Sequence, residues 1–339
     1  MKTTKRFVTL FLSIVLTIVP LTAYAIGPIV EEEMDFSDET LTIGHYDAVT
    51  KTETTETISL SELKAHNEAM KIRLGMFGQN VLNGFDPTSN TSVASVGDEI
   101  VDPQTVFGEE GQEQTRVNVN NYPYRCVMFL LAGVDTNNSG TPDKWSCGTG
   151  FLVGNDVMIT AAHVFYEKVN DVNVFVDECR IYPLQASTTY SNDRNDYYFP
   201  KSWTYSTMYA TSSNKDEHDW IVATLFTPLG LEHGYFAVRD WDASIEGVTP
   251  TVSGYPIATG KTYFQYKSTG PLTGIYPKRM SYRMDTHGGN SGGPVYINGN
   301  QIIGIHTGGG TQNNWALRIF EGLYTIIENR VLAGEELYG

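Results

Sequence analysis

Residues 288–305 read GGNSGGPVYINGNQIIGI. Two short apolar runs, Val295–Ile297 and Ile302–Ile305, flank the tripeptide Asn298-Gly299-Asn300. Runs rich in Val, Ile and Tyr favour strands, and a three-residue connection of Asn and Gly favours a tight turn between them. The stretch therefore predicts a β-hairpin with a glycine-rich loop directly before its first strand.

The same pattern of short apolar runs separated by turn residues extends over residues 105–339. Phe151–Val153 and Val157–Ile159 flank Gly154-Asn155-Asp156, which is a second hairpin signature. Further short apolar runs occupy residues 220–226, 248–255, 263–266 and 280–284. Near the C-terminus, apolar residues recur at helical spacing: Phe320, Leu323, Ile327 and Val331. The pattern predicts an all-β domain that ends in one helix.

The glycine-rich loop contains a single serine, Ser291, with Gly288 and Gly289 before it and Gly292 and Gly293 after it. A nucleophilic serine needs a tight turn that exposes its oxygen and aims backbone N–H groups at the oxyanion that forms. Glycines permit such a turn and leave those groups bare. The alternative is an ordinary serine in a hairpin loop. Ser291 is thus a candidate nucleophile, and the N–H groups of Gly289 and Ser291 are a candidate oxyanion hole.

Two other residues could activate this serine. His163 follows the small residues Ala161 and Ala162 at the end of a predicted strand, where a base can face a cleft; the alternative is a packed or surface histidine. Asp219 opens the apolar strand that starts at Trp220. A buried carboxylate is costly unless it is paired, and orienting a catalytic imidazole would pair it. The alternative for Asp219 is a surface residue that caps the strand.

The order of these residues in the chain distinguishes among hydrolase classes. The pattern Gly289-x-Ser291-x-Gly293 also matches the nucleophile elbow of α/β-hydrolases, but that fold needs an acid and then a histidine after the serine. The only histidine after Ser291 is His306, and no Asp or Glu lies between them. No His-Glu-x-x-His motif occurs, which argues against a metalloprotease. The order His163, Asp219, Ser291 is that of chymotrypsin.

Together, these motifs resemble the trypsin/chymotrypsin superfamily. The string MDTHGGNS at residues 284–291, with Gly304-Ile305-His306, resembles the bacterial glutamyl endopeptidases, and residues 106–125 resemble the start of their mature chains. The resemblance covers roughly residues 105–339. It implies a chymotrypsin-like double six-stranded β-barrel and a serine endopeptidase that acts on protein or peptide substrates through His163, Asp219 and Ser291. It implies no metal or organic cofactor.

The resemblance also implies a specificity pocket, lined by Thr286, His306, Thr307 and Gly308. A hydroxyl and an imidazole can donate hydrogen bonds to a substrate carboxylate, so cleavage after Glu, and less well after Asp, is expected. A core role for His306, satisfied by backbone carbonyls, is the alternative. Asp285 lies six residues before Ser291, where trypsin-like enzymes keep the aspartate that selects Lys or Arg. A Lys/Arg preference, or a protease-like module that binds without cutting, therefore remains an alternative function.

The N-terminal third differs in composition. Residues 1–25 read as a signal peptide, with Lys2, Lys5 and Arg6 before an apolar run and Ala23-Tyr24-Ala25 at its end. Residues 26–104 contain four Lys or Arg against 15 Asp or Glu, which suggests a weakly folding pro-segment, or alternatively a disordered linker. Ser59 and Glu62 have capping-box spacing and predict one helix there. We therefore expect a secreted zymogen whose protease domain spans residues 105–339, with cleavage between Glu99 and Val106.

The composition of the chain limits which kinds of partner it can bind. The net charge of −16 argues against a nucleic-acid partner, and no other stretch is apolar and long enough to span a membrane once the signal is removed. We expect a monomer. Export would permit one disulfide among Cys126, Cys147 and Cys179. Many relatives pair a cysteine near Cys147 with one directly after the catalytic histidine; here Val164 takes that place, so Cys147 would pair elsewhere, with Cys179 as one option, or stay free.

Overall fold

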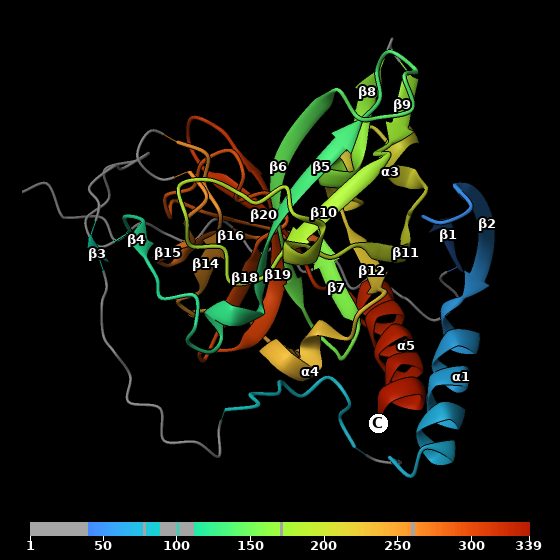
Figure 1. Cartoon of the computed structure of the whole chain (residues 1–339). Helices are drawn as coiled ribbons and strands as arrows, with labels where there is room; N and C mark the ends of the chain where they lie inside the picture. The colour runs from blue at the N-terminus through green and yellow to red at the C-terminus, as the bar shows by residue number, and fades with distance from the viewer. Residues whose placement is uncertain (1–39, 77–78, 89–99, 102–111, 170–171, 259–261) are drawn as a thin grey trace, which may run out of the picture.

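The computed structural model describes residues 40–76, 79–88, 100–101, 112–169, 172–258 and 262–339 (Figure 1). The predicted signal peptide, residues 1–25, lies outside the described residues, as does most of the stretch around the predicted pro-segment boundary. In the described part of the chain, no helix is long and apolar enough to cross a membrane. Antiparallel strands dominate, which confirms the predicted all-β class.

The first sheet is built around the strands that precede and follow the predicted histidine. In spatial order it contains β10 (Glu178–Tyr182), β5 (Val127–Val134), β6 (Lys144–Leu152), β7 (Val157–Thr160), β12 (Ile221–Leu225), β11 (Pro200–Ser206), β1 (Thr40–Asp47) and β2 (Thr52–Ser59). Ile181 and Tyr198 exchange two backbone hydrogen bonds of 2.9 Å, which brings β10 against the residues before β11. The six strands from β10 to β11 thus curl into one barrel, and β1 and β2 extend it.

The second sheet carries the predicted serine loop. Its order is β16 (Leu272–Ile275), β17 (Arg279–Tyr282), β20 (Asn314–Arg318), β19 (Gln301–Gly309), β18 (Pro294–Ile297), β14 (Thr251–Gly254), β15 (Tyr266–Thr269), β4 (Thr115–Arg116) and β3 (Ile100–Val101), with β13 (Ala237–Val238) beside β19. A separate hairpin joins β8 (Tyr166–Val169) and β9 (Val172–Phe175). Both predicted hairpins are present, as β6–β7 and β18–β19. The second sheet has more strands than the six expected because short segments add to its edges.

Helices are few and lie outside the sheets. The longest are α5 (Glu321–Tyr338) and α1 (Leu60–Arg73), and the short turns are α2 (Ala162–Phe165), α3 (Met208–Thr211), α4 (Leu229–His233), η1 (Tyr124–Cys126), η2 (Arg194–Asp196) and η3 (Lys215–Glu217). In α5 the predicted apolar positions are buried, which confirms the C-terminal helix. Helix α1 begins at the predicted capping box, where the Ser59 hydroxyl accepts a hydrogen bond from the backbone N–H of Glu62 at 3.4 Å.

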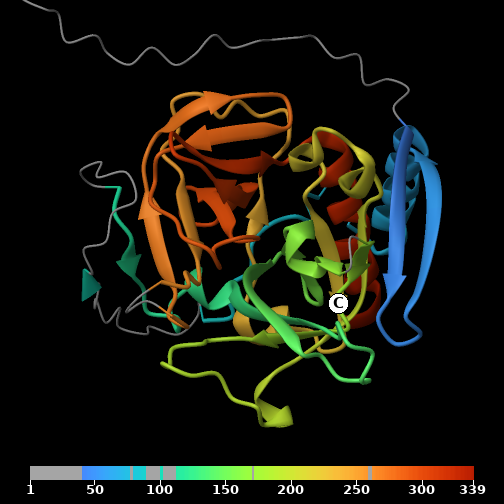
Figure 2. The ribbon, with the colours of Figure 1, turned by 90° about the horizontal axis from the view of Figure 1, so that it is seen from above.

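The acidic N-terminal segment is folded onto the rest of the chain. Strand β1 pairs antiparallel with β11, β2 pairs with β1, and α1 lies beside α5 (Figures 1 and 2). The sequence predicted only the helix, because the run Thr52–Ser59 is polar and mostly exposed and lacks an apolar face. Pairing with an existing sheet edge supplies the backbone hydrogen bonds that this polar hairpin could not hold alone.

Candidate active site

The predicted histidine lies where β7 gives way to the short helix α2. Thr160 ends the strand, and its hydroxyl donates a 2.7 Å hydrogen bond to the carbonyl oxygen of Thr149 on β6. Ala161 and Ala162 are buried, so the backbone passes close under the sheet before His163. His163 therefore follows two buried small residues at the C-terminal end of β7.

Asp219 holds His163 at two points. One carboxylate oxygen accepts from the backbone N–H of His163 at 2.9 Å, and the other lies 2.7 Å from imidazole Nδ1. The carboxyl group of Asp219 is buried, directly before strand β12. With Nδ1–H donating to the carboxylate, Nε2 is left as the basic nitrogen. Burial lowers the pKa of His163, but the charge and hydrogen bond of Asp219 raise it, and the net shift is upward.

The serine loop approaches the histidine through Gly292. A Cβ built there would lie 2.2 Å from the Thr160 hydroxyl and 2.9 Å from the backbone nitrogen of Ala161. Only glycine allows this close contact. The backbone φ of Gly292, +83°, also favours glycine. The backbone N–H of Thr149 donates to the carbonyl oxygen of Ser291 at 2.8 Å. The loop is thus fixed against the strand that leads into His163.

The histidine and serine side chains themselves are not bonded in this structure. Among the described residues, the hydrogen bonds of His163 run to Asp219, and none joins its imidazole to the Ser291 hydroxyl. This contact is often long in enzymes without substrate and tightens when substrate binds. The structure therefore brings Asp219 and His163 into direct contact and places the Ser291 loop beside them.

The backbone before Ser291 is oriented by two hydrogen bonds. The Gly288 carbonyl oxygen accepts from the N–H of Ile257 at 2.6 Å, and the Gly289 carbonyl oxygen accepts from the hydroxyl of Thr149 at 2.7 Å. In a trans peptide the C=O and the following N–H point in opposite directions, so the N–H of Gly289 points away from Ile257. Among the described residues, neither Gly289 nor Ser291 donates its N–H to an acceptor.

Gly289 is the residue on which this arrangement depends. Its φ is +94°, and a Cβ there would lie 2.4 Å from the carbonyl oxygen of Tyr255. A side chain would therefore both strain the backbone and collide with the neighbouring strand end. The glycine-rich loop read from the sequence has a geometric requirement for glycine at positions 289 and 292.

The predicted pocket residues lie along β19 and in the stretch before the serine loop. His306 is buried, and the hydroxyl of Tyr282 lies 2.6 Å from its Nδ1. Burial, reinforced by the nearby His163, lowers the pKa of His306 to about 3. The free protein therefore holds a neutral imidazole at this position, and it can donate from only one ring nitrogen.

Thr307 and Gly308 follow His306 at a shift in the register between β19 and β20. Such a bulge re-aims side chains relative to a regular strand. The side-chain amide of Asn314 on β20 donates to the carbonyl oxygen of Met284 at 2.7 Å, which ties the stretch containing Thr286 to the same hairpin. Thr286 itself is largely buried. The four predicted pocket residues thus come from two segments, which are joined by this bond, by the Tyr282–His306 contact and by the pairing of β17 with β20.

Asp285 is also buried, and its backbone N–H donates to the carbonyl oxygen of Gln112 at 3.0 Å. Gln112 follows directly after the undescribed stretch 102–111. The same carbonyl oxygen also accepts from the hydroxyl of Ser268. The first described residues of the predicted protease domain therefore contact the backbone beside Thr286.

Sequence reasoning missed the residues that support the loop. Thr149 accepts from the N–H of Tyr255 at 3.0 Å while it donates to Gly289, so its single hydroxyl is fully used. Tyr282 was not singled out either. Thr149 stands in the run Cys147-Gly148-Thr149-Gly150, whose small residues were the available signal that two backbones approach closely here.

The cysteines form no disulfide: all three are free thiols. Strand β5 separates β6, which carries Cys147, from β10, which carries Cys179. Across two strand spacings the Cα atoms lie about 9–10 Å apart, beyond the reach of a disulfide. Cys179 is opposite Ala132, which is opposite Ser146, so Cys147 points to the other face. The option of a Cys147–Cys179 bond is therefore wrong.

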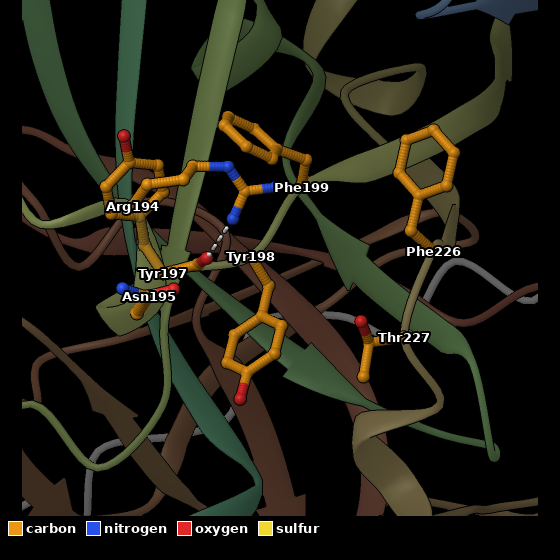
Figure 3. A pocket seen from close by; sticks show the side chains of 7 residues that line it. All are labelled: Arg194, Asn195, Tyr197, Tyr198, Phe199, Phe226 and Thr227. Atoms are coloured by element: carbon orange, nitrogen blue, oxygen red, sulfur yellow. Dashed lines mark hydrogen bonds between the residues drawn. The ribbon is translucent and has the colours of Figure 1, made fainter.

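A shallow pocket of about 520 Å³ lies elsewhere, lined by Arg194, Asn195, Tyr197, Tyr198, Phe199, Phe226 and Thr227 (Figure 3). Phe226 follows the C-terminal end of β12, whereas Asp219 lies before its first residue. Five strand residues, about 17 Å, separate the two ends. Arg194 donates to the carbonyl oxygen of Tyr197 at 3.1 Å and covers the ring of Phe199. This pocket is separate from His163 and contributes nothing to its chemistry.

Comparison with known proteins agrees with this fold. Residues 148–305 match the family model described as a trypsin-like peptidase domain. The glutamyl endopeptidase of Bacillus licheniformis is 28% identical over 242 residues, which cover 67% of this chain and 69% of that protein. A Bacillus subtilis protein named extracellular metalloprotease is 27% identical over 238 residues, with the same coverage. A solved Glu endopeptidase superposes with a TM-score of 0.55 at 23% identity and covers 67% of this chain and 99% of its own.

The family match and the named relatives give the class: residues 148–305 match a trypsin-like peptidase domain, and the chain is a serine endopeptidase. Within that class it is related to the glutamyl endopeptidases, and the solved Glu endopeptidase shares its fold. In the described residues, no group of three or more His, Cys, Asp or Glu side chains is placed to hold a metal ion.

Proposed function

We propose that the chain is a secreted serine endopeptidase that hydrolyses peptide bonds through His163, Asp219 and Ser291, with preference for Glu, and less for Asp, before the scissile bond. The observation that carries the proposal is the two-point contact between Asp219 and His163 beside the serine loop. A carboxylate that binds both the backbone and Nδ1 of one histidine fixes the ring and its tautomer. That is the arrangement a general base needs.

In the acylation step, Nε2 of His163 takes the hydroxyl proton of Ser291 as the oxygen attacks the substrate carbonyl. The resulting imidazolium is stabilised by the buried Asp219 carboxylate. It then gives its proton to the leaving amine, so the peptide C–N bond breaks and an acyl-enzyme remains. Water, deprotonated by the same Nε2, hydrolyses the ester and restores the Ser291 hydroxyl.

The oxyanion of each tetrahedral intermediate would be held by the N–H groups of Gly289 and Ser291. Support comes from the peptide orientation: Ile257 binds the Gly288 carbonyl, so the N–H of Gly289 faces the other way. Donors that are already oriented before the reaction do not have to reorganise as charge develops, which is why such sites are effective.

The preference for Glu rests on Thr286 and His306, with Thr307 and Gly308 lining the same pocket. His306, whose Nδ1 lies beside the Tyr282 hydroxyl and which also bonds the backbone of Trp315, would donate its N–H to a substrate carboxylate in place of that backbone contact. Arrival of that negative charge would favour protonation of His306 and raise its pKa. The pocket would then be electrostatically neutral in the free enzyme and adapt to an acidic side chain.

A Lys or Arg preference set by Asp285 is the second candidate. The aspartate is buried in the stretch that leads to the serine loop, so its carboxyl group is the natural partner for a basic side chain if it faces the pocket. His306 argues against this candidate, because an imidazole is a poor neighbour for a substrate cation.

The precursor organisation is part of the proposal: residues 1–25 as export signal, 26–104 as pro-segment and 105–339 as protease domain. Support comes from the first described residues of the protease domain, because Gln112 contacts the backbone of Asp285 beside the predicted pocket residue Thr286. Cleavage after Glu99 would permit self-processing, whereas cleavage between residues 104 and 105 would need another protease. N-terminal sequencing of secreted protein distinguishes the two.

A matched peptide panel tests the function. Peptides that differ only in the residue before the scissile bond should be cleaved in the order Glu, Asp, then the rest, and a Ser291→Ala variant should cleave none. Faster cleavage after Lys or Arg would overturn the glutamate preference. Equal turnover by the Ser291→Ala variant would overturn the mechanism.

A further inference from the structure

The acidic N-terminal segment makes an interface with the peptidase domain that does not depend on the peptide link between them. We call residues 40–76 and 79–88 the docked segment. Its first contact is strand pairing: Ile43 to Asp47 of β1 lie opposite Ser206 to Ser202 of β11 in continuous antiparallel register. The segment thus covers an edge of the first sheet that would otherwise present unpaired backbone groups.

Close approach at this edge requires a glycine. A Cβ built at Gly44 of β1 would lie 2.2–2.4 Å from ring atoms of Tyr205 on β11. The buried Tyr205 ring therefore lies directly over the Gly44 backbone, and its hydroxyl bonds to Glu53 of β2. The fit at this point depends on a residue with no side chain.

The basic side chains of the docked segment pair with acidic side chains of the peptidase domain. All four Lys and Arg residues of the stretch 26–104 form ion pairs with carboxylates of the peptidase domain. The pairs are Lys51–Asp177, Lys64–Glu321, Lys71–Glu328 and Arg73–Glu336. Three of these four carboxylates are on α5. The cations of the segment thus reach two regions of the peptidase domain, α5 and Asp177, and Lys71 also pairs with Glu68 of the segment itself.

One of these pairs is buried and belongs to a network. Lys71 lies 2.7 Å from Glu328, and both side chains are nearly inaccessible. The fully buried amide of Asn67 donates to the carbonyl oxygen of Thr325 and to the Glu328 carboxylate, both at 3.0 Å. Exposed ion pairs contribute little, whereas removal of one partner from a buried pair leaves a charge without compensation. The α1–α5 contact is therefore the strongest polar element of the interface.

The segment ends on the connection between the two sheets. Phe85 and Tyr235 exchange two backbone hydrogen bonds of 2.9 Å, and the N–H of Val238 donates to the carbonyl oxygen of Leu82 at 2.9 Å. Leu82 is fully buried in the same apolar core as the first sheet. The docked segment thus contacts the peptidase domain at three places: the β11 edge of the first sheet, the C-terminal helix α5 and the connection between the two sheets.

The catalytic groups lie outside this contact. Among the described residues, no hydrogen bond or ion pair joins the docked segment to His163, Asp219 or Ser291. Figure 2 shows β1, β2 and α1 along one side of the first sheet, with the second sheet on the opposite side. The segment is placed to support the peptidase domain without filling its site.

We propose that after the chain is cut between the docked segment and the peptidase domain, the segment remains bound as a noncovalent subunit of the active enzyme, completing the first sheet and bracing α5. This inference rests on the cleavage in the proposed function. Its test, however, uses an inactive enzyme and a foreign protease, so the two can fail separately.

The experiment starts from residues 26–339 with Ser291→Ala and a recognition sequence for a site-specific protease in place of residues 92–98. The protein is cut to completion and passed through gel filtration at low micromolar concentration. We expect both fragments to co-elute as a 1:1 complex with a single melting transition. Elution of the N-terminal fragment on its own would overturn the proposal.

Two substitutions in the docked segment test the interface itself. Gly44→Val should collide with Tyr205, and Lys71→Met should leave Glu328 buried without its cation, so each should raise the dissociation constant of the cut complex at least tenfold. The matched controls are Thr54→Val on exposed β2 and His66→Ala on the exposed face of α1, which should not. Because all four changes lie in the segment, the peptidase fragment is identical throughout. Equal affinity across the set would contradict the proposed contacts.

A last measurement tests whether the bound subunit leaves the site open. The cut complex of residues 26–339 with wild-type Ser291 is assayed for peptide cleavage at protein concentrations that span its dissociation constant. We expect kcat/KM to stay within twofold and the half-life at elevated temperature to lengthen as the complex forms. Inhibition that rises as the complex forms would overturn the placement away from the site. Absence of any cleavage, with the complex still intact, would count against the proposed function alone.

Discussion

The hydroxyl of Thr149 lies 2.7 Å from the carbonyl oxygen of Gly289, to which it donates a hydrogen bond. The Thr149 hydroxyl oxygen also accepts from the N–H of Tyr255 at 3.0 Å, and the backbone N–H of Thr149 donates to the carbonyl oxygen of Ser291 at 2.8 Å. One buried side chain on the first sheet thus sets the position of the serine loop on the second. Thr149 is a positioning residue for the proposed oxyanion hole.

Replacement of Thr149 by Val should lower kcat roughly 10- to 100-fold with little change in KM, because the Gly289 peptide loses its anchor and the oxyanion donors lose their alignment. Thr149→Ser keeps the hydroxyl and should recover most of the rate. Steady-state kinetics on one peptide substrate measure both. If Thr149→Val raised KM alone, the residue would act on substrate binding and not on the loop.

The pH profile should report His163. The base must be neutral to accept the Ser291 proton, and Asp219 raises the pKa of His163 above its ordinary value of about 6.5. Activity is therefore lost as the pH falls through this raised pKa, and the acid limb of kcat/KM should have its midpoint above about 6.5. A stopped assay in a constant-ionic-strength buffer series measures it. A midpoint below 6 would contradict the electrostatic account of the pair.

His306 should control the choice of acidic substrates. His306→Ala removes the proposed donor to the substrate carboxylate, and kcat/KM for a Glu peptide should fall by about 100-fold. The matched peptide with Gln in place of Glu carries no charge, so its cleavage should fall much less. Parallel loss on both peptides would assign His306 a purely structural role in the core with Tyr282.

The cysteines should be reduced in the folded protein. Burial raises the pKa of the Cys147 thiol to about 11 and places those of Cys126 and Cys179 still higher, so all three should react slowly with thiol reagents at neutral pH. We expect three thiols to titrate in denaturant, and the melting temperature to be unaffected by reductant. Fewer than three thiols in denaturant, with a melting temperature that drops on reduction, would show a disulfide that this fold does not contain.

The sequence predicted the elements that carry strong local signals. The β18–β19 hairpin follows from β-branched runs on either side of Asn298-Gly299-Asn300, and α5 from apolar residues at helical spacing. The proposed triad followed from chain order, since the same residue types in another order would have indicated another fold. These features depend on short stretches of sequence or on the order of residues along the chain, so they can be predicted without knowing how the chain packs.

Features that depend on partners far away in the chain were missed. Strands β1 and β2 have no apolar alternation, and exist because β11 offers them an edge. The support of Gly289 by Thr149 joins residues 140 positions apart. The predicted option of a Cys147–Cys179 disulfide was wrong because β5 lies between β6 and β10. The sequence does not show this strand order, which decides which thiols can meet.

The most direct test of the central claim is chemical labelling of the serine. The enzyme is treated with a fluorophosphonate, digested with an unrelated protease and mapped by mass spectrometry, alongside a His163→Ala variant. We predict one adduct, on Ser291, in the wild type and a rate of labelling slower by a factor of roughly 10³ or more in the variant. An unlabelled Ser291 in properly folded wild-type protein, or equal labelling in both proteins, would contradict the account.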